Sequence, residues 1–285
     1  MFKKIITVTT LALALFSGPV LAEWKPNGSI TMMTMFPPGG GGAAMAKILK
    51  TAPADGMTIG FAVSETFSFA PAMNPKIGYT ADDFSFIGAV ANTQVGWVAA
   101  ADSPYNSLED LVAAAKDGAE IEVGVFSPRA NAAVRAIGKH FGVEFIPVPI
   151  KSGNEGINNI LNGHLDTTLV GGPQAPHVRK GALKVLASLE AERLIVGKNA
   201  LTLIESGAPV ATFRVKWTLA APAGMPEDIL KAWTAALESS MTNETLRAFI
   251  TEKMSLKMNF TPGDLLKDEI VKGRGASEAL IGFLR

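Results

Sequence analysis

The chain has no cysteine, and only three histidines and two tyrosines, among its 285 residues. Without cysteine there is no disulfide, no thiol nucleophile and no thiolate zinc site. The histidines, at positions 140, 164 and 177, fit no zinc spacing. The motifs G-x-S-x-G, H-E-x-x-H and G-x-x-x-x-G-K-[ST] are also absent. We therefore expect a protein that is not an enzyme and that holds no metal or cofactor.

Neither sign of charge is in surplus, since 26 basic residues stand against 26 acidic ones. A nucleic-acid partner would require a basic surplus, so none is expected. Long apolar runs are confined to the N-terminus, where Lys3 and Lys4 precede an apolar stretch at 5–16 and small side chains follow at 20–22. This pattern is typical of a secretory signal peptide. We expect export of the chain, with cleavage near Ala22.

Strand-like and helix-like segments alternate along the rest of the chain, which predicts an α/β fold with parallel sheets. The expected strands are 29–36, 57–63, 84–91, 95–100, 121–126, 145–149, 166–170, 184–189 and 217–221. The expected helices are 43–51, 107–117, 130–141, 156–162, one ending at 177–181, 227–239, 243–252 and one near 264–280. Ser107 and Asp110 have the spacing of a capping box.

The order of these segments predicts two lobes. The chain leaves one α/β unit near residue 100 and returns to it near Trp217, which makes two crossovers and hence a hinge. The predicted domains are a signal peptide at 1–22, lobe I at 23–100 and 217–285, and lobe II at 101–216. A ligand would bind in the cleft between the lobes, where loops follow strand ends.

A glycine run at 37–42 lies between a predicted strand and a predicted helix. Its uncovered N–H groups and the helix dipole suit an anion, although a flexible turn explains the run equally well. Gly39-x-Gly41-x-x-Ala44 also matches a loose dinucleotide fingerprint, with Glu65 where a ribose-binding acid would lie. Four consecutive glycines satisfy many patterns by accident. An exported dinucleotide-dependent enzyme therefore stays as an alternative.

Two loops of the second lobe are further candidates. In the segment Ser127–Asn131, either Ser127 or Asn131 could cap the next helix, and Arg129 or Arg135 could hold a carboxylate. The alternative is an ordinary cap with solvated arginines, and it fits Arg135 better than Arg129. Gly171-Gly172 is either a tight connection or a close approach of the backbone to a ligand.

Several segments, in this order, resemble the periplasmic receptors of tripartite tricarboxylate transporters, the Bug or TctC-type family. The matching segments are 30–41, 52–59, 74–75, 79–84, 107–111, 148–153, 163–166, 181–187 ending at Arg193, and 217 with 221–226. The resemblance implies a two-lobed "Venus flytrap" in the periplasm, acting as a monomer. It would close on a small carboxylate and pass it to the membrane permease subunits.

In that family, loop amides and ordered waters hold the ligand's carboxylate. We carry these loops over to this sequence by position and combine them with the candidates above. The predicted ligand-binding residues are then Pro38, Gly39, Gly40, Gly41, Ser64, Glu65, Thr66, Ser127, Arg129, Asn131, Gly171 and Gly172. One departure is that a helix and a strand, about 20–30 residues, are missing after the first glycine loop. The expected cost is a new sheet edge and uncovered apolar surface. A non-transporting sensor with an incomplete pocket is thus a further alternative.

Overall fold

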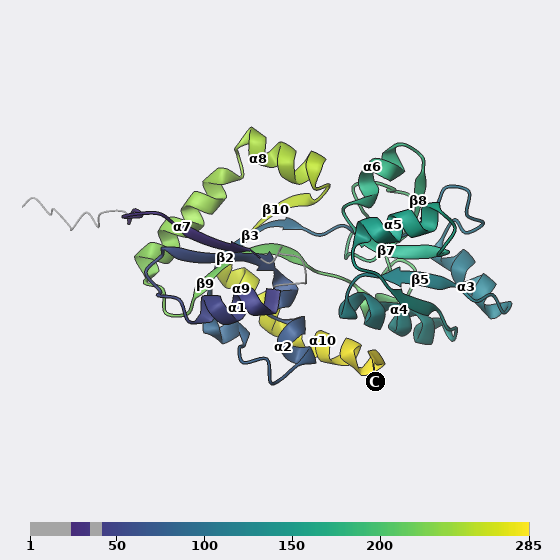
Figure 1. The fold of residues 1–285 in the computed structure, drawn as a ribbon, viewed down its shortest axis with the longest axis horizontal. Coiled ribbons are helices and arrows are strands. Elements are labelled where there is room, and N and C mark those ends of the chain that lie inside the picture. The colour runs from purple at the N-terminus through teal and green to yellow at the C-terminus, as the bar shows by residue number, and fades with distance from the viewer. Residues whose placement is uncertain (1–23, 35–41, 285) are drawn as a thin grey trace, which may run out of the picture.

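Two five-stranded sheets organise the protein, one in each lobe (Figure 1). The computed structural model describes residues 24–34 and 42–284. The sheet of lobe I has the order β1 (Thr31–Thr34), β2 (Thr58–Val63), β9 (Lys216–Pro222), β3 (Phe84–Asn92) and β10 (Lys257–Pro262). The sheet of lobe II has the order β6 (Ile146–Pro149), β5 (Glu122–Val125), β7 (Thr167–Gly171), β4 (Val95–Ala100) and β8 (Leu183–Ser188). The predicted α/β, two-lobed architecture with two crossovers is confirmed.

Helices cover both sheets. In lobe I they are α1 (Gly42–Lys50), α2 (Phe69–Met73), α7 (Glu227–Ser240), α8 (Glu244–Ala248), α9 (Gly263–Lys272) and α10 (Arg274–Ile281). In lobe II they are α3 (Leu108–Lys116), α4 (Pro128–Phe141), α5 (Gly153–Leu161) and α6 (Gln174–Arg179). Short helical turns are η1 (Ser64–Thr66), η2 (Ala81–Asp83), η3 (Pro209–Ala211), η4 (Phe249–Lys253) and η5 (Gly282–Leu284). Within the described residues, no helix is long and apolar enough to cross a membrane.

The sheets are mixed, so the prediction of parallel sheets was wrong. Among the strands named above, β1–β2, β5–β6 and β5–β7 pair in parallel and the other pairs are antiparallel. The strand β9 lies between β2 and β3 and runs antiparallel to both, because it enters lobe I from the cleft side after the second crossover. By the same logic β4 enters lobe II from the cleft and pairs antiparallel with β7 and β8.

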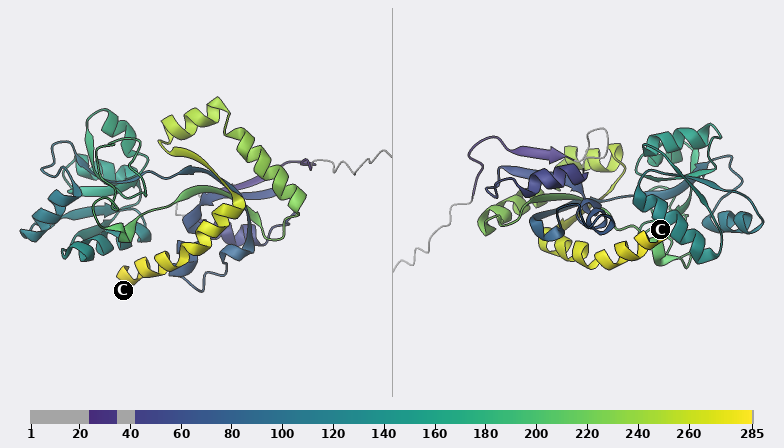
Figure 2. Two further views of the ribbon diagram at one scale, coloured as in Figure 1. Left: turned by 180° about the vertical axis from the view of Figure 1, so that it is seen from behind. Right: turned by 60° about the horizontal axis from the view of Figure 1, so that its bottom comes forward.

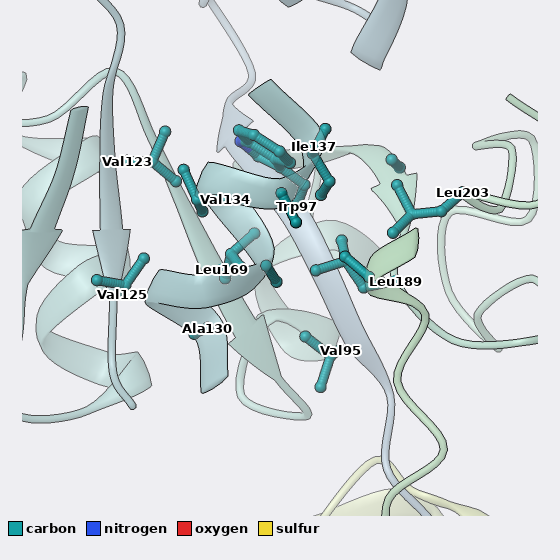
Figure 3. Packing of buried hydrophobic residues seen from close by; sticks show 14 of the residues in the cluster. Val95, Trp97, Val123, Val125, Ala130, Val134, Ile137, Leu169, Leu189 and Leu203 are labelled. Carbon is teal, nitrogen blue, oxygen red and sulfur yellow. The ribbon is translucent and has the colours of Figure 1, made fainter. Parts of the chain in front are cut away.

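The first crossover comes earlier than predicted. The strand at 95–100 was expected in lobe I, but it is β4 of the lobe II sheet, so the chain crosses at residues 93–94. The physical reason is the Trp97 side chain, which is fully buried in the lobe II core. Its ring packs edge-on against Phe145, and its N–H donates to Thr167 Oγ1 at 2.9 Å. In Figure 3, residues of α4 lie over this strand.

Serine caps define several helix starts. Ser107 Oγ accepts from Asp110 N at 3.1 Å, as predicted. The carboxylate of Asp110, however, accepts from Asn106 N at 2.7 Å, one residue before the cap, so the reciprocal half of the capping box is displaced. Ser127 caps α4 in the same way by accepting from Ala130 N at 3.1 Å.

Strand β1 forms one edge of the lobe I sheet and leaves apolar surface uncovered. Its Met32 side chain lines an apolar cavity of about 460 Å³ together with residues of β2, β9 and α8. Met32 and Phe249 are each 53% exposed. The described residues thus leave apolar side chains exposed beside this edge strand.

The C-terminal helix α10 links the two lobes. It continues from α9 of lobe I and packs on both α2 and α4 (Figure 2). Its Leu280 and Ile281 side chains are buried in the same cluster as the α4 residues and Phe69 of α2. This helix is thus a physical connection between the lobes in addition to the two crossovers.

Candidate functional site

A cavity of about 650 Å³ lies between the lobes. The strand directions explain its position, because β2 and β3 of lobe I and β5 and β8 of lobe II all end toward it. Residues just beyond these ends line it: Ser64 and Glu65 after β2, Thr93 after β3, Arg129 after β5, and Glu190 after β8. This is the expected location of a ligand in open α/β sheets.

An ion pair between Arg129 and Glu65 joins the lobes across this cavity. Arg129 Nε lies 2.8 Å from Glu65 Oε1, and the two side chains are only 14% and 22% exposed. Neither atom makes a well-aligned hydrogen bond, so charge attraction holds the pair. Burial raises the pKa of the Glu65 carboxyl, and the charge of Arg129 opposes that rise. Glu65 is therefore paired with Arg129 through one of its two carboxylate oxygens.

Aromatic rings fix the Arg129 guanidinium. Its Cζ lies 4.7 Å from the ring centroid of Phe213 and 5.6 Å from that of Phe69. Its Nη2 donates to the Thr212 carbonyl at 3.3 Å. No described residue accepts a hydrogen bond from Nη1. A guanidinium has five N–H donors, so this one retains donors for a ligand.

Glu190 connects the cavity to the first crossover. Its Oε1 accepts from the Thr93 hydroxyl at 2.8 Å and from Val95 N at 2.9 Å. The side chain is buried, and no described residue donates to Oε2 or forms an ion pair with the carboxyl. Burial raises the pKa of Glu190 to about 8, and the nearby charge of Glu65 adds to the rise. Hydrogen bonds from Val95 and Thr93, and the charge of Arg129, oppose it.

The raised pKa of Glu190 predicts how stability depends on pH. Between its ordinary value of 4.5 and about 8, the folded protein holds a proton that the unfolded chain releases. The free energy of unfolding should therefore fall as pH rises through this window. We expect the free energy of unfolding of Glu190→Gln, measured with urea and compared with that of the natural protein, to be more favourable at pH 8.5 than at pH 5. A difference that is the same at both pH values would contradict this assignment.

The two crossovers are bonded to each other where they run side by side. Thr93 N donates to the Val215 carbonyl at 2.9 Å, and Lys216 N donates to Ser64 Oγ at 3.1 Å. Several further charges at the cavity are paired: Lys216 Nζ lies 2.7 Å from Glu269 Oε2, and Lys257 pairs with Glu192 of lobe II. Arg214 also lines the cavity, and no described residue forms an ion pair with it. The cavity thus has a bonded hinge at its base and charged pairs along its walls.

Three of the predicted ligand-binding residues, Ser64, Glu65 and Arg129, line the cavity. The predicted positions Pro38, Gly39, Gly40 and Gly41 lie outside the described residues. The other predicted residues are not among those that line the cavity: Thr66, Ser127, Asn131, Gly171 and Gly172.

Each of these other residues has a partner within the protein. The Thr66 carbonyl accepts from the Tyr79 hydroxyl at 2.9 Å, and Asn131 Oδ1 accepts from Arg135 Nε at 2.9 Å on the surface of α4. The N–H of Gly172 donates to Gln174 Oε1 at 2.7 Å. Gly172 has φ +113, and a Cβ there would meet the Met254 carbonyl oxygen at 2.8 Å, so this glycine permits close contact with lobe I.

Sequence reasoning missed Glu190, Thr93 and the segment 212–216. The rule that selected Glu65, an acid just beyond a strand end, applies equally to Glu190 after the predicted strand 184–189. Thr93 and Phe213 carry no such signal, because only the pairing of the crossovers places them at the cavity. Among the described residues, no group of three or more His, Asp or Glu could hold a metal ion.

Comparisons with known proteins agree with this architecture. A protein of Cupriavidus necator, described as the UPF0065 protein in the gbd 5′ region, is 25% identical over 224 residues, which cover 75% of this chain and 67% of that protein. A TctC solute-binding protein from Polaromonas has a TM-score of 0.75 at 21% identity, over 90% of this chain and 99% of that one. MatC from Rhodopseudomonas palustris, solved with bound malate, has a TM-score of 0.69 at 20% identity, over 85% of each chain.

These solved structures share the two-lobed fold of the present chain. The family model described as "Tripartite tricarboxylate transporter family receptor" (TctC) matches residues 31–263, most of the sequence. The chain belongs to this family of tripartite tricarboxylate transporter receptors.

Proposed function

We propose that the protein is a periplasmic receptor that captures a small carboxylate in the cavity between its lobes and delivers it to the permease subunits of a tripartite transporter. The proposal assigns it no chemistry on the ligand. It rests on the family, and on a cavity of about 650 Å³, which lies within the range of small-molecule sites. The relative MatC holds malate in its solved structure.

The observation that carries the proposal is the position of Arg129. This cation is held by Phe213 and Thr212 at the wall of the cavity and still has unused N–H donors. A guanidinium matches the two oxygens of a carboxylate, and such charge-assisted pairs are stronger than neutral hydrogen bonds. Because Arg129 is already preorganised, little side-chain entropy is lost when an anion binds.

Thermal unfolding in the presence of mono-, di- and tricarboxylates tests ligand capture. A ligand present at 100 times its dissociation constant stabilises a protein by about 2.7 kcal/mol. For a chain of this size, that corresponds to a rise in Tm of about 5–10 °C. We expect at least one carboxylate in the panel to give such a rise.

The matched control is a set of uncharged amides with the same carbon skeletons as the acids. These amides should leave Tm unchanged, because they offer no anion to the guanidinium. If the folded protein gives no shift with any carboxylate, or the same shift with the amides, the carboxylate receptor is refuted.

A further inference from the structure

Two acidic side chains, Glu65 and Glu190, line the cavity together with Arg129. Arg129 is in direct contact with Glu65, and both are close enough to Glu190 for their charges to act on it. The three side chains therefore form a cluster of one cation and two acids, the acid cluster below. Among the other cations that line the cavity, Lys216, Lys257 and Lys272 are paired with Glu269, Glu192 and Asp268. No described residue forms an ion pair with Arg214, so the acid cluster is distinguished by its position and not by a net negative charge of the cavity.

Glu190 is the unmatched member of the acid cluster. Its Oε1 is fully used by Thr93 and Val95, whereas Oε2 receives no hydrogen bond from a described residue. The residue lines the cavity, so a guest can reach this carboxyl. A carboxylate oxygen left without a donor gains most from a positively charged donor, because such charge-assisted hydrogen bonds are the stronger ones.

Arg129 and Glu190 therefore present opposite requirements within one cavity. The unused donors of Arg129 suit a carboxylate, while the open oxygen of Glu190 suits an ammonium group. We propose that the receptor selects an aminocarboxylate, a ligand with both a carboxylate and an ammonium group, and that Glu190 is the residue that recognises the ammonium. This inference rests on the proposed function and narrows its substrate class.

Protonation provides a readout that separates recognition from a structural role. Because burial raises the pKa of Glu190 to about 8, its carboxyl is largely protonated at pH 7 in the empty cavity. An arriving ammonium favours the carboxylate form, so Glu190 would release its proton to the buffer as the ligand binds. Glu65 faces the same guest but already has Arg129 as its partner.

The experiment uses matched ligands that differ only in the α-ammonium: aspartate with succinate, glutamate with glutarate, and alanine with propionate. We expect at least one amino member to bind at least tenfold more tightly than its partner in titration calorimetry at pH 7. Repeating the titration in buffers of different ionisation enthalpy should reveal proton release with the amino member alone.

The variant Glu190→Gln keeps an acceptor for Thr93 and Val95 but removes the charge. In this variant the affinity for the amino member should fall at least tenfold, and its binding should release no proton. The affinity for the member without ammonium should change by no more than about twofold. The control Glu205→Gln, at an exposed ion pair with Arg193 outside the cavity, should leave both affinities unchanged.

Tighter or equal binding of the members without ammonium would overturn the inference and leave the carboxylate receptor intact. An equal loss of affinity for both members of a pair in Glu190→Gln would also overturn the inference, because Glu190 would then act only through its bonds to the crossover. Binding of no member of any pair would overturn the inference, whereas the proposed function would be refuted only if no carboxylate of the wider thermal-unfolding panel binds either.

Discussion

Replacing Arg129 with glutamine is expected to weaken carboxylate binding at least about 30-fold, equivalent to 2 kcal/mol, because truncating one partner of a buried charged contact costs this much or more. The glutamine cannot supply the forked donor pair. It also leaves Glu65 buried beside Glu190 with no cation between them. Calorimetry with the best ligand of the panel measures the loss of affinity directly.

The same substitution should also destabilise the protein. Breaking a buried pair by removing one partner costs about 3–5 kcal/mol, since the remaining charge is uncompensated. Here the pair keeps some exposure, at 14% and 22%, so we expect a value near the lower end of that range. The double variant Glu65→Gln with Arg129→Gln should recover much of this stability but none of the affinity.

Arg135→Gln is the matched control, because Arg135 lies on the same helix and its exposed side chain donates to Asn131 outside the cavity. It should change neither the affinity nor the free energy of unfolding by more than about 0.5 kcal/mol. If Arg129→Gln binds carboxylates as the natural protein does, Arg129 is not the anion-binding group.

Replacing Gly263 with alanine is expected to destabilise the protein by at least about 3 kcal/mol. A Cβ at this first residue of α9 would lie 1.8 Å from the Phe86 carbonyl oxygen and 2.6 Å from its carbon. Both are backbone atoms of β3, so no side-chain rotation relieves the clash. Overpacking usually costs 1–3 kcal/mol, and a backbone overlap this close exceeds the usual case. Urea unfolding measures the change.

Gly275 in the neighbouring helix α10 supplies the control. Nothing lies within 4 Å of a Cβ placed there, so Gly275→Ala should stabilise the helix by up to about 1 kcal/mol. Equal effects of the two substitutions would show that α9 does not approach β3 as closely as described.

The amino-acid sequence was sufficient for most elements but not for their connections. Alternating patterns predicted β2, β3, α3 and α7 to within about two residues. Strand β10 was missed because it is partly exposed and carries the polar residues Lys257 and Asn259 at its cleft end. Strand β4 belongs to lobe II because the Trp97 side chain is buried in the hydrophobic core of that lobe. This is a tertiary contact, which local sequence patterns do not predict.

The candidate site was predictable only in part for the same reason. Arg129 and Glu65 each follow a strand, and that rule was enough to select them. Their mutual pairing across the lobes, and the use of Glu190 to bond Thr93, depend on how two distant segments meet. Gly172 was selected as a ligand-binding residue from its place after a strand, but its N–H donates a hydrogen bond to Gln174 within the protein.

The helix α10 has a consequence for how the receptor moves. A pure rotation about residues 93–94 and 212–215 would separate α2 from α4, and α10 is packed on both. Leu280 and Ile281 would therefore have to slide over one of these helices while they stay in contact with the other. Gly273, between α9 and α10, is a position where the chain could bend during this movement. Closure in this molecule then combines bending at the strands with shear at the C-terminus, and the apolar contacts of its last turn limit how far the lobes can part.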